Sequence, residues 1–278
     1  MWIPVQGGQG RLFVERTFVY KMSGWDAEIY LRFSDERTQP SVDLAGRIAI
    51  PDPGRIMDLG CGPGNSTAVL RRRWPKADIT GLDGSPDMIA SASRSYPHYE
   101  WLIGDIAAWS AGIPFDVVFS NAALQWVPSH EVLFPHLLAQ VAPGGALAVQ
   151  VPAHFNSALH REILETAEDP AWRHLMGPAL NALTKEPPSF YYNLLRPLTA
   201  RLDIWQTEYY HVVDSPQSII EWFRGTGLRP FLAVLESEEQ RKRFEELLLE
   251  RYTLAYHPQN DGRILFPFRR LFIIAYRA

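Results

Sequence analysis

A short apolar run, a glycine-rich turn and the beginning of a helix follow one another in Arg55-Ile56-Met57-Asp58-Leu59-Gly60-Cys61-Gly62-Pro63-Gly64-Asn65-Ser66-Thr67. The apolar residues predict the end of a buried strand, and Ser66 or Thr67 is a suitable start for a helix. Glycines allow a ligand to approach the backbone closely, and the N-terminus of a helix presents N–H groups that have no partner within the helix. The run therefore predicts a nucleotide-binding corner.

The spacing of the glycines narrows the choice of ligand. A dinucleotide fingerprint would place its third glycine where this chain has Asn65, and no Gly-Lys-Ser/Thr of a phosphate-binding loop follows. Asp58 lies at the end of the predicted strand, and an acid there suits a cationic ammonium group better than a pyrophosphate. A plain tight turn between strand and helix would also account for the glycines. The cofactor-binding candidates in this run are Asp58, Gly60, Gly62, Gly64 and Asn65.

Two later strands also end in acidic residues. Asp83 closes the strand at 79–83, where a carboxylate can accept hydrogen bonds from both hydroxyls of a ribose. Asp105 and Ile106 follow the strand at 99–104, where an adenine amino group would need an acceptor, although Asp105 could instead cap a helix or turn. Met88, in the helix that Ser85 caps, could cover one face of an adenine or belong to the core.

The carboxyl end of the fourth predicted strand, 115–120, supplies further candidates because open α/β sheets bind their ligands at that edge. Asn121 leaves the strand there, followed by Gln125 and Trp126. A helix at 130–141, a turn at 142–145 and a fifth strand at 146–151 come next.

This fivefold alternation of strand and helix predicts a doubly wound, mostly parallel α/β sheet. Residues 153–201 are helical pieces interrupted by prolines, which we interpret as a cap inserted after strand five. Strands at 202–211 and 270–276 bring the sheet to seven strands, with helices at 215–222 and 236–256.

The N-terminus differs from the rest of the chain. Residues 1–21 have no helical periodicity, so we expect a disordered extension, with the domain running from 22 to 278. Tyr30 and Arg37 follow in helical segments. They could form a lid over the cofactor, with Arg37 beside a carboxylate, or simply pack on the surface.

Composition excludes several classes of function. The chain has 278 residues, 46% of them hydrophobic and 21% charged, and a formal net charge of −4, which does not favour a nucleic-acid partner. No apolar run is long enough to predict a membrane span. The single cysteine, Cys61, excludes an internal disulfide and fits a reducing compartment, so we expect a cytoplasmic protein. We expect no metal site, and nothing in the sequence indicates the oligomeric state.

The residues Asp58-Leu59-Gly60-Cys61-Gly62-Pro63-Gly64, followed by Asp83 and Asp105-Ile106, resemble in order and spacing the pattern of the class I S-adenosylmethionine (SAM) methyltransferases. Later segments resemble one family among them, the trans-aconitate 2-methyltransferases: Leu124-Gln125-Trp126, Tyr209-Tyr210-His211, Thr226-Gly227-Leu228-Arg229-Pro230 and Arg270-Leu271-Phe272-Ile273. The resemblance implies a Rossmann-like fold and transfer of a methyl group from SAM to a carboxylate of trans-aconitate. The products would be a monomethyl ester and S-adenosylhomocysteine.

The substrate of such a reaction constrains its binding site. A carboxylate is ionised at neutral pH, so its methylation requires no general base. A tricarboxylate does require cationic partners, and the guanidinium of arginine binds carboxylates with two parallel hydrogen bonds. We therefore expect Arg229 and Arg270 to hold the substrate, unless they form surface ion pairs. The remaining catalytic candidates are Gln125, Trp126, Tyr209, Tyr210 and His211.

Two other functions remain open at this point. The first is a SAM-dependent methyltransferase of another small molecule, which would need an apolar pocket and a base such as His211. The second is a SAM-binding protein without catalytic activity.

Overall fold

The computed structural model describes residues 34–278, and their side chains from Thr38 onward. The expectations for the extension at 1–21, for the domain start at 22, and for Tyr30 and the Arg37 side chain lie outside the described residues.

A seven-stranded sheet forms the centre of the molecule, with the strand order β3-β2-β1-β4-β5-β7-β6. Neighbouring strands are parallel except where β7 pairs with β5 and β6 in antiparallel register. The doubly wound, mostly parallel sheet predicted from the sequence is confirmed. The strands are β1 (Arg55–Leu59), β2 (Asp78–Asp83), β3 (Glu100–Ile103), β4 (Phe115–Asn121), β5 (Val141–Pro152), β6 (Thr199–Val213) and β7 (Ile264–Arg277).

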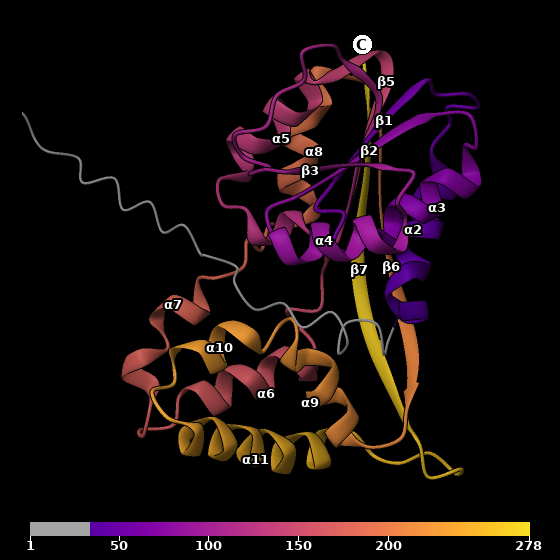
Figure 1. Ribbon diagram of the computed structural model, residues 1–278. Coiled ribbons are helices and arrows are strands. Elements are labelled where there is room, and N and C mark those ends of the chain that lie inside the picture. The colour runs from indigo at the N-terminus through magenta and orange to yellow at the C-terminus, as the bar shows by residue number, and fades with distance from the viewer. Residues whose placement is uncertain (1–33) are drawn as a thin grey trace, which may run out of the picture.

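Helices cover both faces of this sheet (Figure 1). On one face, α2 (Ser34–Arg47) and α3 (Asn65–Arg73) bury Leu44 and Leu70 against the strands. On the other, α5 (His130–Ala139) and α8 (Pro188–Leu195) share a core with the sheet. The helix α4 (Pro86–Ser95) packs against β2 and β3.

A separate layer of helices lies beyond the carboxyl end of β5 (Figure 1). Its members bury their apolar side chains in a core that includes Phe266 and Phe268 from the first half of β7. They are α6 (Ala158–Ala167), α7 (Gly177–Leu180), α9 (Pro216–Arg224), α10 (Arg229–Val234) and α11 (Glu238–Ala255).

The boundaries expected for the cap therefore need correction. Of the segment 153–201, α6 and α7 belong to the helical layer, but α8 lies on the sheet, where Tyr191 and Leu195 are buried with α5. The other three helices of the layer come from the chain between β6 and β7. Prolines marked the breaks between helices correctly but carried no information about which core each helix joins.

The turn expected at 142–145 is also wrong, because β5 runs through it. The pairing of β5 with β4 shifts in register between Phe115 and Val117, so residues 142–145 form an irregularity within β5. At Gly145 an added Cβ would lie 2.6 Å from the carbonyl oxygen of Asp116. Gly145 thus allows β5 to approach β4 closely, and the chain does not reverse here.

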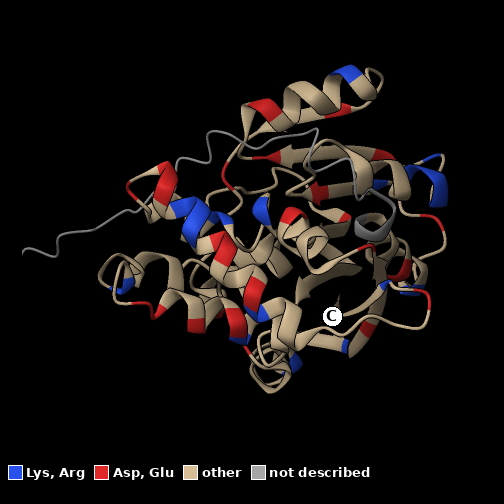
Figure 2. Ribbon diagram, turned by 90° about the horizontal axis from the view of Figure 1, so that it is seen from below, with Lys and Arg blue, Asp and Glu red and all other residues tan. Residues whose placement is uncertain are grey.

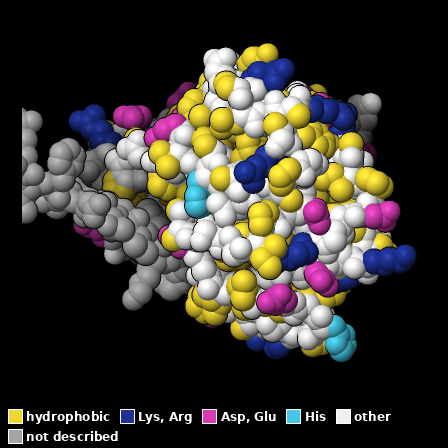
Figure 3. Space-filling view, turned by 90° about the horizontal axis from the view of Figure 1, so that it is seen from above, with side chains coloured by type: hydrophobic (Ala, Val, Ile, Leu, Met, Phe, Trp, Pro, Cys, Tyr) yellow, Lys and Arg dark blue, Asp and Glu magenta, His cyan; other side chains and the backbone are white. Residues whose placement is uncertain are grey.

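The surface carries no strong segregation of charge in the views from above and below. Acidic and basic residues alternate over the helical layer (Figure 2), and charged side chains are scattered singly over the opposite end of the molecule (Figure 3). Among the residues that the structure describes, no helix combines the length and the apolar character needed to cross a membrane.

Candidate active site

Asp58 fixes the corner between β1 and α3. One of its carboxylate oxygens accepts hydrogen bonds of 2.6 Å from the hydroxyls of both Ser66 and Thr67, in the first turn of α3. The side chain is fully buried, and its other oxygen, Oδ1, has no partner among the described residues. Burial raises the pKa of Asp58 to about 6, against the effect of the two hydroxyls. A buried carboxylate with an unused oxygen suits a cationic ligand.

The glycines of the turn have different structural roles. Gly60 and Gly62 both have positive φ angles, 70° and 54°. A Cβ at Gly60 would lie 2.2 Å from the Cβ of Ala123, whereas at Gly62 it would meet nothing within 4 Å. Gly60 is therefore required by the packing of the protein itself, while Gly62 faces open space that a ligand could fill. Gly64 is the N-cap residue of α3, and Asn65 is its first residue.

Asp83 joins the turn to the neighbouring strand. Its two oxygens accept hydrogen bonds from the backbone N–H of Gly62, at 2.9 Å, and of Ser85, at 2.8 Å. Burial raises the pKa of Asp83 although these hydrogen bonds oppose the shift. Each carboxylate oxygen keeps a second lone pair, so the side chain could still accept ribose hydroxyls.

The residues expected around the adenine also have roles within the protein itself. Asp105 is exposed and its Oδ1 accepts a hydrogen bond of 2.9 Å from the N–H of Ala107, which is the turn cap considered as its alternative role. Ile106 is buried close to Gly60, within 3.6 Å of an added Cβ. Met88 is 4% exposed in α4, as a core residue would be.

A second group of polar side chains lies at the carboxyl ends of β4 and β5. Asn121 and Gln150 are register partners there, and the two strands are joined further by a hydrogen bond from the N–H of Ala122 to the carbonyl of Gln150. Ala122 adopts a left-handed conformation with φ 56°, which is rare for alanine and often accompanies a functional site. Three buried atoms have no partner among the described residues: Asn121 Oδ1, Gln125 Oε1 and Gln150 Nε2.

Arg270 reaches the same edge of the sheet from β7. It is 4% exposed, donates a hydrogen bond of 3.3 Å to Gln150 Oε1, and places its guanidinium 4.6 Å from the ring centre of Phe268. A buried guanidinium at this edge of the sheet is a suitable partner for a ligand carboxylate.

Of the three consecutive candidates on β6, two lie on this side. Tyr209 and His211 stack in parallel, with 6.2 Å between ring centres. The Tyr209 hydroxyl donates to Asp43 on α2, at 2.6 Å. Burial, followed by the charge of Arg270, lowers the pKa of His211 to about 4, and its Nε2 has no partner among the described residues.

The structure places the remaining substrate candidates on three different elements. Tyr210 points to the opposite face of β6, where it is 57% exposed and donates to Glu208 at 2.6 Å. Alternation of side chains along a strand makes this unavoidable for the middle one of three residues. Arg229 begins α10 in the helical layer. Trp126 is half-buried in the 3₁₀ turn Leu124–Trp126.

Four polar residues at this edge were not predicted. Gln150 is concealed inside a buried strand, and His154, His160 and Lys185 fall in the segment taken for a cap. His154 is 6% exposed and His160 is 5% exposed. The signal that could have identified His154 is its position as the second residue after β5, the position that Ala123 has relative to β4.

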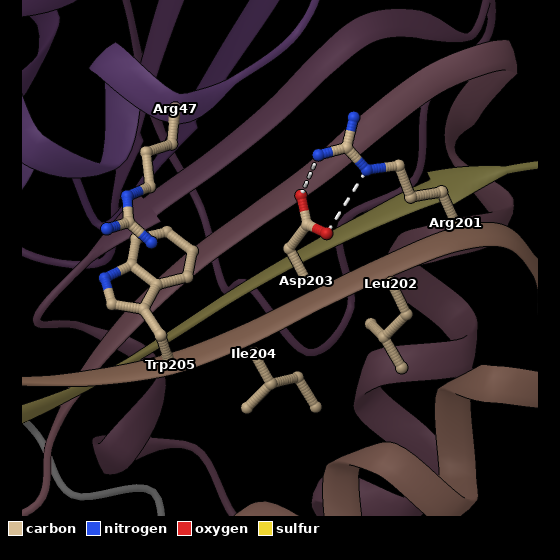
Figure 4. Close-up of a pocket in the computed structure, with 6 residues that line it drawn as sticks. All are labelled: Arg47, Arg201, Leu202, Asp203, Ile204 and Trp205. Atoms are coloured by element: carbon tan, nitrogen blue, oxygen red, sulfur yellow. Dashed lines mark hydrogen bonds and ion pairs between the residues drawn. The ribbon is translucent and has the colours of Figure 1, made fainter.

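A surface hollow of about 480 Å³ lies elsewhere, along residues 201–205 of β6. Arg47 lies over the ring of Trp205, and Arg201 forms an ion pair with Asp203 (Figure 4). These residues lie on β6, the edge strand of the sheet, where β4, β5 and β7 separate them from the glycine turn after β1, so the hollow is separate from the cofactor corner.

Comparison with known proteins agrees with this geometry. The family model of a methyltransferase domain matches residues 56–145, which include the glycine turn, Asp83 and Asp105. The chain is 46% identical over 255 residues to a trans-aconitate 2-methyltransferase of Rhodopseudomonas palustris strain BisB18, covering 91% of this chain and 99% of the relative. It is 42% identical over 256 residues to the enzyme of the same name from Azoarcus sp. strain BH72, covering 92% of this chain and 100% of the relative.

The chain belongs to the trans-aconitate 2-methyltransferase family.

Solved structures agree with the fold that this family implies. A putative methyltransferase from Bacillus halodurans superposes with a TM-score of 0.55 at 12% identity, covering 86% of this chain and 98% of the other. A phosphoethanolamine N-methyltransferase from Haemonchus contortus, in complex with S-adenosylhomocysteine, gives a TM-score of 0.53 at 14% identity over 86% of this chain and 53% of the other. At these identities the likeness concerns the fold alone.

The residues present fit the SAM cofactor of a methyltransferase. Asp58, whose Oδ1 has no partner among the described residues, lies just before the glycine turn, and Asp83 accepts a hydrogen bond from Gly62 in that turn, where an added Cβ would meet open space. An ammonium group and a ribose are the parts of SAM that such carboxylates would hold.

Proposed function

We propose that this protein transfers the methyl group of SAM to a carboxylate of trans-aconitate, giving the monomethyl ester and S-adenosylhomocysteine. In the reaction a carboxylate oxygen forms a bond to the methyl carbon while the bond from that carbon to sulfur breaks, and the electron pair of the broken bond stays on the sulfur. No proton moves in this step.

The chain's own residues have to bind, orient and desolvate. Asp58, Asp83 and the open backbone at Gly62 hold the cofactor. At the carboxyl ends of β4 and β5, the Nε2 of Gln150 can donate to a substrate carboxylate and direct it toward the methyl group, while the amide oxygens of Asn121 and Gln125 can accept hydrogen bonds from N–H or O–H groups of a ligand. The layer of helices α6, α7 and α9–α11 covers this end of the sheet and would exclude water from the reacting groups.

One observation carries the proposal: a buried arginine, Arg270, lies at the carboxyl edge of the sheet beside amides whose polar atoms lack partners. Buried polar atoms without partners are costly, and a ligand with several carboxylates would satisfy those that can donate. The names of the two relatives point to a substrate of this chemistry.

The low pKa of His211 argues against a rival substrate that would have to lose a proton from a hydroxyl or amine during methylation. A general base works best when its pKa is near the working pH, and the pKa of His211 is about 4. A carboxylate substrate needs no such base, so a buried neutral histidine can serve as a hydrogen-bonding group.

We place the reaction in the cytoplasm, because the chain's single cysteine fits a reducing compartment. The partner is a small polycarboxylate.

The experiment is a turnover assay of the purified protein with SAM and a panel of acceptors, following S-adenosylhomocysteine. The panel contains trans-aconitate, a saturated tricarboxylate, a monocarboxylate and a phenol. The proposal expects the highest kcat/KM for trans-aconitate. Turnover of the phenol alone would identify another methyltransferase, and SAM binding without turnover of any acceptor would identify a non-catalytic binding protein.

A further inference from the structure

His154, His160 and Lys185 form a cluster just beyond the carboxyl end of β5. The rings of His154 and His160 are 6.0 Å apart at near right angles, and the Lys185 ammonium lies 3.2 Å from His160 Nε2. Phe155 completes the cluster, with its ring centre 5.3 Å from the Lys185 ammonium and 5.2 Å from the centre of the His160 ring. Because an ammonium can only donate, His160 Nε2 accepts this hydrogen bond and the imidazole is neutral.

Among the described residues, each charge that shifts the pKa of His154 or His160 is positive. Burial is the main cause that lowers the pKa of His154 well below its usual value, and the charges of His160, Arg270 and Lys185 add to it. Burial and Lys185 lower the pKa of His160 to about 4. The α9 helix, also packed on His154, contributes the uncharged ring of Phe223. The neighbouring carboxylate of Glu186 acts instead on His130 and Tyr191.

One atom of the cluster indicates a missing ligand. His154 is 6% exposed, and its Nδ1 has no partner among the described residues. An imidazole nitrogen buried without a hydrogen bond is costly, so its retention calls for an explanation. Lys185 is exposed enough to meet a ligand that arrives from solvent, while His154 lies deeper.

Two connections join this cluster to the candidate active site. The ring of Phe268 lies between them, 4.5 Å from the ring centre of His154 and 4.6 Å from the guanidinium of Arg270. Thr184, which precedes Lys185, donates its N–H to the carbonyl of Gln125 at 2.8 Å. Movement of the Lys185 segment would therefore disturb the loop that follows β4.

We infer that His154, His160 and Lys185 form a subsite for a second carboxylate of the substrate, the one farthest from the methyl group, and so select polycarboxylates over shorter acids. This inference rests on the proposed function. Lys185 supplies the charge at the entrance, where its ammonium turns from His160 Nε2 to the carboxylate. The anion then stabilises a proton on His160 and His154, so that the neutral imidazoles become cationic as the substrate binds.

The proton gives this subsite a pH signature. Without ligand the histidines are neutral at pH 7, and a bound carboxylate raises their pKa, since an opposite charge favours the protonated form. Binding therefore takes up protons, and the affinity for a tricarboxylate increases as the pH falls from about 8 toward the pKa that the histidines reach in the complex. A shorter acid that does not reach the cluster lacks this dependence.

The test compares Lys185→Gln and His160→Gln with wild type, and uses Lys242→Gln as a matched control, because Lys242 is an exposed lysine on α11. Initial rates are measured with trans-aconitate and with an unsaturated dicarboxylate that lacks the distal carboxylate, at about pH 6.5 and about pH 8. Loss of a charge-assisted hydrogen bond costs about 1.5–3 kcal/mol, so Lys185→Gln should raise KM for trans-aconitate roughly ten- to a hundredfold. The change should fall on KM rather than kcat and spare the dicarboxylate, while His160→Gln flattens the pH dependence of KM.

The same variants are titrated calorimetrically with citrate, which reports the subsite without turnover. Proton uptake by wild type that is reduced in His160→Gln supports the subsite even if trans-aconitate is not methylated, a result that would overturn only the proposed function. Equal loss for the tricarboxylate and the dicarboxylate in Lys185→Gln, or a KM unchanged from wild type, would overturn the subsite.

Discussion

Replacing Asp83 by alanine separates the role of this residue in the fold from its role toward the cofactor. Its oxygens hold the N–H groups of Gly62 and Ser85, so the variant leaves two backbone donors without their partner. An unsatisfied donor costs about 1–3 kcal/mol where water does not reach it, and 1 kcal/mol corresponds to about 2–4 °C in melting temperature at this chain length. Loss of the ribose hydrogen bond costs about 1.5–3 kcal/mol more, or roughly ten- to a hundredfold in SAM affinity.

The assay for Asp83→Ala is calorimetric titration with SAM and with S-adenosylhomocysteine, next to a thermal melt. Both ligands share the ribose, so both should weaken by the same factor. Asp78→Ala is the matched control, since Asp78 is an exposed acid at the other end of the same strand. A melting temperature that falls while SAM affinity stays at the wild-type value would refute the ribose assignment and leave Asp83 as a purely structural link between the two loops.

Three further changes probe other parts of the site. Burial raises the pKa of Asp58 in the folded protein to about 6, above its value in the unfolded chain, so the cost of burying its charge is present above pH 6 and is relieved as the pH falls through that value. Because a bound ammonium favours the ionised carboxylate, SAM affinity measured by titration across this range should drop below pH 6. An affinity that does not change with pH would show that the ammonium lies elsewhere. Gly62→Ala places a Cβ into the open space beside a backbone with φ 54°, so it should weaken SAM binding. The strained backbone should also lower the free energy of unfolding by about 1–2 kcal/mol, measured by chemical denaturation. Unchanged SAM affinity would mean that the cofactor does not approach this backbone. Arg270→Lys should lower kcat/KM for trans-aconitate at least tenfold and leave SAM affinity unchanged, because an ammonium lacks the planar fork of the guanidinium. An equal loss of kcat/KM and of SAM affinity would indicate that Arg270 has a structural role.

The sheet could be predicted from the sequence because each buried strand ends at a recognisable signal. The glycine turn after Leu59 and the acid at Asp83 identify two carboxyl ends directly, and the structure confirms both strands. The residues that we propose for the cofactor are local to these ends, so they could be proposed from the order of the chain alone.

The residues that we propose for the substrate come from segments far apart in the chain, and local patterns do not reveal which of these segments meet. Gln150 and Arg270 are in contact through the antiparallel register of β5 and β7, which no spacing in the sequence specifies. Tyr210 matched the family segment together with its neighbours, yet strand alternation turns it to the other face. His154 and Lys185 were assigned to a cap because prolines around them suggested an insertion.

The chemical identity of the methylated product tests the central claim most directly. The protein is incubated with trans-aconitate and SAM labelled with ¹³C in the methyl group, and the product is examined by NMR and by mass spectrometry before and after mild alkaline hydrolysis. The account predicts one labelled methyl ester per product molecule and release of labelled methanol on hydrolysis. A labelled methyl group that resists hydrolysis, or that appears on no polycarboxylate, would contradict it.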